Sequence, residues 1–511
     1  MADVLIVGAG PTGLALALNL IRRGVSVRLV TEAPGPGTTS RAMLMVARTL
    51  ELYRQFGLAD AMVASGVRVA AAHIRQAYEG HEREVLKVEL GGFGKDLSPY
   101  PFALAYPQDD QERLLAKTLE GEGLRIEWST KLAGFTQDER GVRARLERKG
   151  GETEDMEAAW LCGCDGAHSA VRQGLKVGFP GGTYELLFYV ADVRIDGPFE
   201  PDLFFNLGGD VLALMLPVRS SGMQRLIGLV PRELKDKADL GFDDIRPTVE
   251  ALIGVRVATV NWFSTYRVHH RVAERFRVGR AFLLGDAAHI HSPAGGQGMN
   301  TGVGDAMNLG WKLADAVRGR ASLSILDTYE PERIAFARRL VKTTDRVFTL
   351  AVAGGLEGAF ARRLALPAIF RLATATEIGR RFFFRMLSQF VVNYRGGALS
   401  EGAAGRLRGG DRLPWTGAGG PDNFAPLASC DWQVHVHGEP AADLKAEAGR
   451  HGLPVHGFPW SEAAEKAGIA RDAAYLIRPD GYVGLAAPLS EAASALESYA
   501  RHTGLRGSGS V

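Results

Sequence analysis

The hydrophobic pattern changes its period twice within the first thirty-two residues. Residues 3–7 (Asp-Val-Leu-Ile-Val) form an apolar run with the length and β-rich composition of a buried parallel strand. Leu14, Leu18 and Ile21 then recur at helical spacing, and residues 25–30 have the composition of a second strand. This order predicts a strand–helix–strand unit at the start of the chain.

The turn between the first strand and the helix is rich in glycine, with the sequence Gly-Ala-Gly-Pro-Thr-Gly at 8–13. Gly8 permits a tight turn, Gly10 lets the backbone approach a pyrophosphate, and Gly13 lets helix and strand pack closely. The helix N-terminus adds free N–H groups and the positive end of a dipole. Glu32, nineteen residues beyond Gly13, is placed to accept a hydrogen bond from a ribose hydroxyl. The unit predicts dinucleotide binding, and the alternative is a turn that binds nothing.

Farther along, apolar runs and alternation predict more strands and helices. Residues 47–56 predict a helix that ends at Gly57, after a Gly- and Pro-rich loop at 33–39. Residues 67–100 change to short β-rich pieces, which we assign to another sheet. The remaining predicted elements are a strand leading into a helix at 104–115, a strand at 125–128, a strand pair at 142–146 and 157–161, and apolar β-segments at 203–205, 211–216 and 260–263.

Two acids directly follow predicted strands. Asp165 lies in an Asp-Gly turn after the second strand of the predicted pair, and a helix begins near Ser169. Asp286 ends the strand at 281–285, and from Asn300 the chain becomes a helix with one apolar face. Gln108 lies at a further strand–helix junction. Such junctions are where ligands collect on open α/β sheets, although an Asp-Gly turn alone is common in structures without ligands.

Three basic side chains near these motifs have two interpretations each. His289 and His291 are candidates for acid–base catalysis, but nothing in the sequence pairs either with a carboxylate. We therefore interpret both as structural residues or as residues that line the site. Arg41 is placed to reach a pyrophosphate or ribityl group, and the alternative is a solvated surface arginine.

Composition places the chain among ordinary globular proteins. Its 511 residues allow about three domains, with 46% hydrophobic and 23% charged residues. A net charge of +2 argues against a dedicated nucleic-acid binder. Cys162, Cys164 and Cys430 form neither a CxxC pair nor a disulfide framework, which predicts a reducing compartment and no metal site. The first strand starts at once and no apolar run is of membrane-spanning length, so we expect a cytoplasmic protein without signal peptide or membrane span.

The last third of the chain has a different character. Residues 338–390 predict helices with basic residues among Phe and Leu, which we interpret as a connecting segment with a solvated basic face rather than a membrane-surface helix. Residues 396–428 are rich in Gly and Pro and predict a linker. Beyond it the pattern predicts a strand at 432–436, a helix at 462–468, two strands about a turn at 474–483, a helix at 489–500 and a frayed tail at 506–511.

Taken together, these motifs resemble those of the class A FAD-dependent aromatic hydroxylases, which include para-hydroxybenzoate hydroxylase, phenol hydroxylase and the polyketide hydroxylases. The resemblance covers residues 1–345 densely. Its motifs are the glycine turn with Glu32, Ser-Arg-Ala at 40–42, Gln108 with Glu112, the Asp-Gly motif at 164–172, the Gly-Asp motif at 285–302 and Tyr-Glu-Pro-Glu-Arg at 329–333. The residues after 400 resemble the thioredoxin-like domain of the phenol hydroxylase branch, without its CxxC.

The resemblance implies an α/β fold in three parts. These are a discontinuous Rossmann-like FAD-binding domain, a β-sheet substrate domain and a C-terminal thioredoxin-like domain. We expect the FAD-binding domain at 1–70, 101–174 and 276–345, the substrate-binding domain at 71–100 and 175–275, a helical connection at 346–400, and the thioredoxin-like domain at 401–511.

The resemblance also implies FAD as the cofactor and assigns residues to it. Gly8, Gly10 and Gly13 would hold the pyrophosphate, Glu32 the adenosine ribose and Asp286 the ribityl hydroxyls. The glycine-rich loop that leads to Asn300 would run under the isoalloxazine ring. The implied cofactor-binding residues are Gly8, Gly10, Pro11, Thr12, Gly13, Glu32, Arg41, Gln108, Asp165, Asp286, Pro293, Gly296, Gly298, Met299 and Asn300. A catalytic residue is not identified.

The implied reaction is hydroxylation of a phenolic or polyketide-like aromatic substrate. NADPH or NADH reduces the flavin and leaves, and O2 then forms a flavin C4a-hydroperoxide that transfers its distal oxygen to the ring. Because water would destroy this peroxide, we expect the β-segments of 175–275 to wall an apolar pocket, although each single residue there is more typical of a domain core. Baeyer–Villiger oxidation, epoxidation, reduction, and a non-catalytic binding protein of the same fold remain alternatives. We expect a monomer or a homodimer that binds no nucleic acid.

Overall fold

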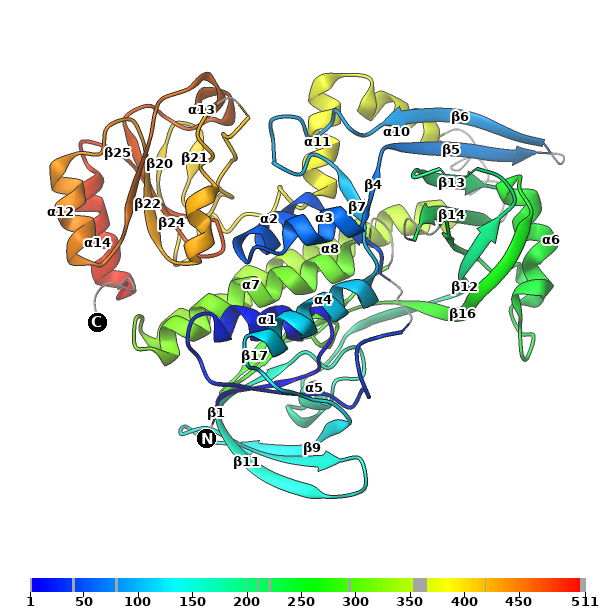
Figure 1. Cartoon of the computed structure of the whole chain (residues 1–511), viewed down its shortest axis with the longest axis horizontal. Coiled ribbons are helices and arrows are strands. Elements are labelled where there is room, and N and C mark those ends of the chain that lie inside the picture. Colours follow the sequence, from blue (N-terminus) through cyan, green and yellow to red (C-terminus); the bar gives the residue numbers. More distant parts are fainter. Residues whose placement is uncertain are drawn as a thin grey trace.

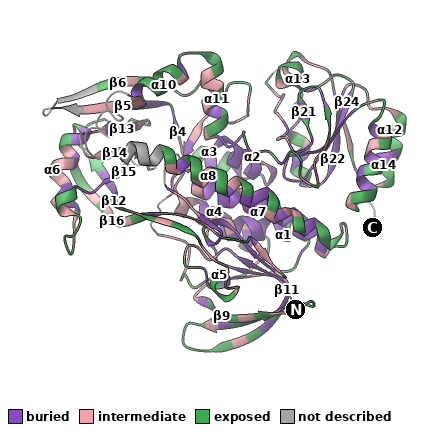
Figure 2. Cartoon of the chain, turned by 180° about the vertical axis from the view of Figure 1, so that it is seen from behind, coloured by how far each residue is buried: buried purple, intermediate pink, exposed green. Residues whose placement is uncertain are grey.

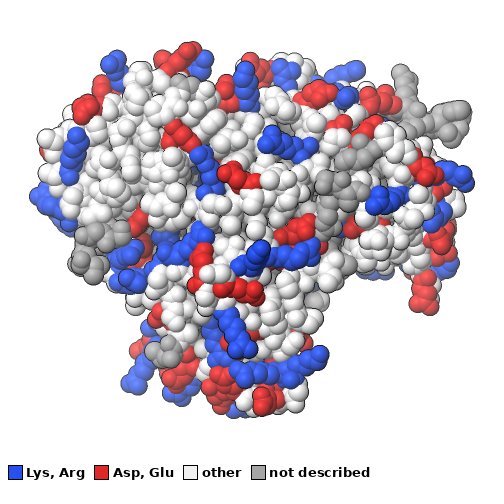
Figure 3. Space-filling model, in the orientation of Figure 1, with Lys and Arg blue, Asp and Glu red and all other residues white. Residues whose placement is uncertain are grey.

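Four β-sheets and the helices around them make up the described chain in the computed structural model (Figure 1). Positive and negative side chains are interspersed over the face shown in Figure 3, in agreement with the small net charge. The structure describes residues 2–38, 42–78, 81–198, 200–208, 211–218, 222–292, 296–352, 365–418 and 420–505.

The first sheet is mostly parallel and contains the predicted N-terminal unit. Its main path runs β17-β18-β11-β1-β2-β8, and β10 and β9 continue from β11 as antiparallel strands. The apolar run of β1 is central, in parallel pairs with β2 and β11. The strands are β1 (Ala2–Val7), β2 (Val27–Val30), β8 (Ile126–Glu127), β9 (Thr130–Gln137), β10 (Val142–Arg148), β11 (Thr153–Gly163), β17 (Arg277–Val278) and β18 (Ala281–Leu283).

Two long helices that carry motif residues pack against each other beside this sheet, and Figure 2 colours both largely as buried. They are α1 (Pro11–Ile21) and α7 (Gln297–Val317). Their close approach requires a glycine, because a Cβ on Gly302 would lie 2.3 Å from Thr12 Oγ1. Helices α2 (Ala47–Gln55), α3 (Ala59–Ser65), α4 (Gln108–Gly121), α5 (Ala170–Gly174) and α8 (Tyr329–Val352) complete this part.

The second sheet is mixed, and helix α6 (Phe242–Ile253) covers one of its faces. Its order is β19-β16-β12-β15-β14-β13-β5-β6, with a parallel pair between β13 and β5. Phe204 and Met215 pack with Ile245 of α6 in a core, as expected for single residues of the apolar segments. The strands are β5 (Ala71–Tyr78), β6 (His81–Glu89), β12 (Gly181–Ile195), β13 (Leu203–Leu207), β14 (Leu212–Pro217), β15 (Gln224–Leu229), β16 (Val257–Val272) and β19 (His289–Ile290).

A small sheet and two helices lie where the first two sheets approach each other. The small sheet has the order β3-β7-β4, from β3 (Leu44–Met45), β7 (Ala103–Ala105) and β4 (Val67–Val69). Met43 and Leu44 pack against Leu216 and Val218 of the second sheet, so this segment joins the two units. The helices are α10 (Leu366–Thr374) and α11 (Glu377–Leu387). None of the described helices is both long enough and apolar enough to cross a bilayer.

The C-terminal part forms a sheet of order β21-β20-β25-β24-β22-β23. Residues 401–408 belong to this sheet as β20 and β21, so the Gly- and Pro-rich stretch is not a free linker as its composition predicted. Its β22–α12–β23 crossover and the following β24–β25 pair fit a thioredoxin-like domain, which stays a prediction. The elements are β20 (Glu401–Ala404), β21 (Leu407–Arg408), β22 (Gln433–His437), α12 (Ala442–Arg450), β23 (Val455–Phe458), α13 (Glu462–Ala467), β24 (Ala473–Ile477), β25 (Val483–Pro488) and α14 (Ala492–Thr503).

Buried ion pairs join this C-terminal sheet to the helices of the first unit. Arg478 follows β24 and donates to both carboxylate oxygens of Glu332 on α8, at 2.8 and 3.0 Å. Lys312 of α7 donates to the same carboxylate at 2.7 Å. Burial alone would raise the pKa of Glu332, but Arg478 and Lys312 lower it to about 2. The end of β24 and the turn after it, predicted only as a turn, therefore carry one of the contacts between the two parts, and Arg412 with Glu51 supplies another.

Candidate functional site

The register of the first sheet brings four predicted motifs to one edge. Val7, the last residue of β1, pairs with Gly163 of β11 and with Val30 of β2, and Gly163 pairs with Leu283 of β18. Because these strands are parallel, the residues that follow them emerge on the same side. The residues that follow these four strands include Gly8, Glu32, Asp165 and Asp286, in agreement with the predicted strand–turn junctions.

The glycine turn has the geometry that its sequence predicts. Gly8 has φ +105°, and a Cβ there would lie 2.2 Å from the carbonyl oxygen of Cys164. A Cβ on Gly13 would lie 1.9 Å from the carbonyl oxygen of Gly8. Gly10 differs, because a Cβ there would meet no atom of the described chain within 4 Å, and no described side chain caps α1. Open space before an uncapped helix N-terminus fits the pyrophosphate of a dinucleotide.

The Asp-Gly motif is connected to the Gly-Asp motif through Arg172. This arginine donates to the carbonyl oxygen of Ala287 at 3.0 Å and to that of Ala167 at 2.7 Å. Asp165 accepts from the Val171 N–H through Oδ2, at the start of α5. Its buried Oδ1 has no hydrogen-bond partner in the described chain, and burial raises the pKa of this carboxyl. An unpaired buried oxygen at the strand edge fits a donor on a bound ligand.

Buried charges hold the Gly-Asp loop from beneath. Asp305 of α7 accepts from the Gly285 N–H at 3.0 Å and bonds His289 Nε2 at 2.7 Å. Its other oxygen accepts from Arg333 at 2.6 Å, and Arg333 also donates to Thr301. Burial alone would raise the pKa of Asp305, but Arg333 and His289 hold it below its ordinary value. The expectation that no carboxylate pairs with His289 is wrong, because its partner lies sixteen residues away on a helix face.

The N-terminus of α7 is the second uncapped helix end at this edge. The helix starts at Gln297 rather than at the predicted Asn300, and Gly296 precedes it with φ +61°. Asn300 is 1% exposed. Its side chain donates to the carbonyl of Leu44 and accepts from Val46 N–H and Thr49. The amide of Asn300 thus fastens β3 and α2 to α7, and no described side chain caps the start of this helix.

His291 presents a buried nitrogen beside the same helix start. Its Nδ1 lies 2.7 Å from the carbonyl oxygen of Ser292, so Nδ1 carries the proton and Nε2 a lone pair. Nε2 has no hydrogen-bond partner in the described chain and lies 3.6 Å from where a Cβ on Gly298 would be. Burial lowers the pKa of His291 to about 4, so the imidazole is neutral at pH 7. His291 therefore lines the site, as one of its two interpretations stated.

The remaining predicted residues divide into three groups. Gln108 begins α4, where its backbone N–H donates to Ala42 and its side chain to Glu112. Pro11, Thr12, Gly298 and Met299 lie in the first turns of α1 and α7. Arg41 and Pro293 lie outside the described residues.

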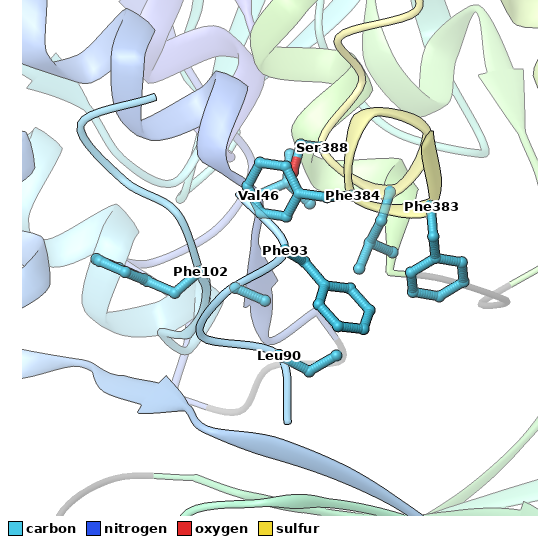
Figure 4. Close-up of a pocket in the computed structure, with 9 residues that line it drawn as sticks. Val46, Leu90, Phe93, Phe102, Phe383, Phe384 and Ser388 are labelled. Carbon is cyan, nitrogen blue, oxygen red and sulfur yellow. The ribbon is translucent and has the colours of Figure 1, made fainter. Parts of the chain in front are cut away.

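An apolar pocket lies next to the α7 start (Figure 4), and aromatic rings from two segments face each other across it. Phe93 and Phe102 come from the chain after β6, and Phe383 and Phe384 from α11. Val46, which Asn300 binds, also lines it, and Gln297 at the α7 start donates to the carbonyl of Leu387. The described residues that line this pocket lie at 46–103 and 383–388. Residues far apart in sequence form it, so no local pattern indicated it. The predicted substrate pocket between the β-segments of 175–275 stays a prediction.

Sequence reasoning missed the three residues that fasten the two acidic motifs. Arg172 and Arg333 belonged to longer motifs but were not predicted to have a role of their own, and Asp305 was not identified as a candidate. The available signal was an acid among Val303, Ala306 and Met307 on the apolar face of a predicted helix. A charge at such a position needs a buried partner of opposite sign.

Comparison with known proteins places these features in a family. Residues 1–344 match the family described as "FAD binding domain". The chain is 38% identical to 6-methylpretetramide 4-monooxygenase of Streptomyces rimosus, over 79% of this chain and 72% of that protein. It is 30% identical to dialkyldecalin synthase of Streptomyces rugosporus, over 98% and 99% of the two chains. A crystal structure of aklavinone-11 hydroxylase with FAD and aklavinone is similar with a TM-score of 0.79 and 27% identity, over 98% of each chain.

Proposed function

The chain belongs to the FAD binding domain family and is a flavin-dependent monooxygenase of the aromatic and polyketide group, and from this premise we propose that it hydroxylates a phenolic or polyketide-like ring at the expense of NAD(P)H and O2. The observation that carries the proposal is the convergence of the glycine turn, Asp165 and Asp286 at one strand edge, beside the uncapped starts of α1 and α7.

The residues of this site fit FAD. The open space at Gly10 and the uncapped start of α1 suit the pyrophosphate, and Asp286 at the strand edge suits the ribityl hydroxyls. Bound FAD would supply the redox chemistry of a reaction in which NAD(P)H is oxidised, one oxygen atom of O2 enters the substrate and the other leaves as water. The start of α7 directs N–H groups and a positive dipole end toward negative charge, which favours the reduced, anionic state of the ring.

The chain also supplies the exclusion of water. The rings of Phe93, Phe383 and Phe384, together with Val46 and Leu387, line a small pocket beside α11, and its described lining is apolar except for Ser388. An apolar, closed surround slows the unproductive loss of activated oxygen as hydrogen peroxide. The neutral His291 adds a hydrogen-bond acceptor rather than a charge beside Gly298 at the start of α7. We assign no general base.

The cofactor half of the proposal is tested with Asp286→Ala. We expect the variant to purify with less flavin and to bind added FAD more weakly, as measured by absorbance and by titration of flavin fluorescence. Asp155→Ala, which removes an exposed acid of the β10–β11 hairpin in the same unit, is the matched control and should keep its flavin. Equal flavin content in both variants would contradict the assigned role of Asp286.

The reaction half is tested by a screen of phenols and polycyclic aromatics. A substrate should stimulate NAD(P)H consumption, and under 18O2 the product should gain one labelled oxygen. Insertion of the label into a ring carbon–carbon bond, rather than into a hydroxyl, would identify the Baeyer–Villiger alternative.

A non-oxidative activity is the second candidate, because one of the relatives that match nearly the whole chain is named a dialkyldecalin synthase. Such an enzyme would convert its substrate without consuming NAD(P)H. Product formed anaerobically and without nicotinamide would favour this candidate over hydroxylation.

A further inference from the structure

The exposed apolar side chains of this protein are concentrated on one pair of helices. Of the seven large apolar side chains that are exposed in the described residues, six lie between 369 and 391, on α10, α11 and the turn after α11. They are Ile369, Leu372, Ile378, Phe382, Met386 and Val391. Leu372 is 77% exposed and Ile378 82%, and they flank the turn between the two helices. We call these six residues the apolar helix face.

This face is a built surface rather than a frayed end. Ile378, Phe382 and Met386 recur every four residues, so they lie on one side of α11. Thr376 caps α11 by accepting from the Gly379 N–H at 3.0 Å. A Cβ on Gly379 would lie 2.1 Å from the carbonyl oxygen of Ala373, so the two helices touch at that glycine.

The opposite side of α11 is committed to the pocket. Phe383, Phe384 and Leu387 line it, and Phe384 packs over Gly94, where a Cβ would come within 2.4 Å of its ring. Figure 4 shows both phenylalanines on the pocket side of the helix. The helix therefore separates an internal apolar cavity from an external apolar surface by one layer of side chains.

The charges around the face are mostly positive. Residues 369–391 contain four arginines and one glutamate. Arg381 and Arg385 lie next to the Ile378–Phe382–Met386 side of α11 by helical spacing. Burial and then the neighbouring Arg412 and Arg381 lower the pKa of Arg385, as expected where positive charges crowd together. A two-fold contact with a second copy would bring these arginines against their own equivalents, which is unfavourable.

We propose that the apolar helix face docks the protein on an anionic lipid surface. The apolar side chains of the hairpin would enter the acyl boundary, and the arginines beside them would contact lipid headgroups. The helices lie in the surface and do not cross it. For an apolar aromatic substrate, the bilayer would also concentrate the substrate beside α11. This last effect rests on the proposed function, whereas the docking itself does not.

The test is sedimentation of the flavin-loaded full chain with vesicles. We expect binding to vesicles of phosphatidylcholine with phosphatidylglycerol, weak binding to pure phosphatidylcholine, and a decrease in 0.5 M NaCl. Phe382→Glu should abolish the binding, and Arg381→Ala should lower the partition coefficient about five-fold. Leu323→Glu changes the one large apolar side chain that is exposed outside the face in the described residues, and this variant should bind like the wild type.

Flavin content and substrate-stimulated NAD(P)H consumption in solution separate this inference from the proposed function. Phe382→Glu should leave both intact while vesicle binding is lost. Failure to sediment with phosphatidylglycerol vesicles would overturn the inference, whatever the activity. It would also be overturned if sedimentation velocity showed a dimer that Phe382→Glu dissociates, because a second copy would then cover the face.

Discussion

The two segments that we propose hold the cofactor are built in opposite ways. The turn at Gly8–Gly13 is made by backbone alone, with glycines where a Cβ would collide and one glycine before open space. The loop at Gly285–His289 depends on buried side chains, namely Asp305, Arg333 and Arg172, which come from three other elements. The first segment is constrained by backbone, its own and that of Cys164, whereas the second depends on charged side chains from three other elements.

This difference changes how each segment fails. A Cβ at Gly8 or Gly13 would collide with a backbone carbonyl oxygen at 2.2 or 1.9 Å, a steric conflict that only a backbone shift relieves. Loss of one partner in the ionic set leaves a charge buried without compensation. We therefore expect the loop to be the more sensitive of the two to single substitutions.

The largest effect is expected for Asp305→Ala. Arg333 would keep a buried charge without its carboxylate, and Gly285 N–H and His289 would lose their acceptor, at a cost of about 3–5 kcal/mol in the free energy of unfolding. Urea-induced unfolding measures this loss of stability. The exposed pair of Arg143 with Glu157 is the control, since Arg143→Ala should change stability by less than about 0.5 kcal/mol. Similar losses in both variants would show that burial does not amplify the Asp305 contacts.

A comparison of Gly13→Ala with Gly10→Ala separates the effect of packing from the effect of ligand binding within the turn. A Cβ on Gly13 meets the Gly8 carbonyl, so we expect a loss of about 1–3 kcal/mol for the protein without FAD. A Cβ on Gly10 meets nothing in the described chain, so stability should hold while the Kd for FAD rises. Thermal unfolding without FAD measures the stability of each variant, and fluorescence titration with FAD measures its Kd. A stable Gly13→Ala protein would mean that the turn adjusts more easily than its geometry indicates.

His291 predicts a pH dependence with a definite sign. Its pKa is about 4 in the folded protein and near 6.5 when unfolded, so the unfolded chain binds the proton more tightly. Stability is then complete above about pH 6.5 and falls as the pH drops toward 4, by about 2 kcal/mol at pH 5. His291→Leu should flatten this part of the profile in chemical denaturation at several pH values. An unchanged slope between pH 7 and 5 would assign the dependence to other groups.

The smallest expected effect is that of Arg172→Lys on the connection between the acidic motifs. One ammonium cannot reach both carbonyls that the guanidinium contacts, at Ala167 and Ala287, so one hydrogen bond worth about 1 kcal/mol is lost. We expect a slightly higher Kd for FAD with unchanged folding. A Kd equal to that of the wild type would show that the loop keeps its position without this bridge.

The strand–turn junctions could be predicted because each one is written in consecutive residues. The apolar run before Gly8, the Asp-Gly turn at Asp165 and the Gly-Asp turn at Asp286 all lie at the strand edge where the pattern put them. The pairing of His289 with Asp305 could not be predicted, since it requires the packing of α7 beneath the loop. The same holds for the pocket, whose walls come from the chain after β6 and from α11.

By itself, the sequence determined the order of strands, turns and helices and the glycines that a close backbone approach requires, because periodicity and steric limits act over a few residues. Only the tertiary structure decided which buried charges meet, where the aromatic cavity lies, and which side of α11 remains outside. Burial determines how strongly a charge or an apolar ring affects stability. Burial in turn depends on how the elements pack together rather than on any one stretch of the sequence.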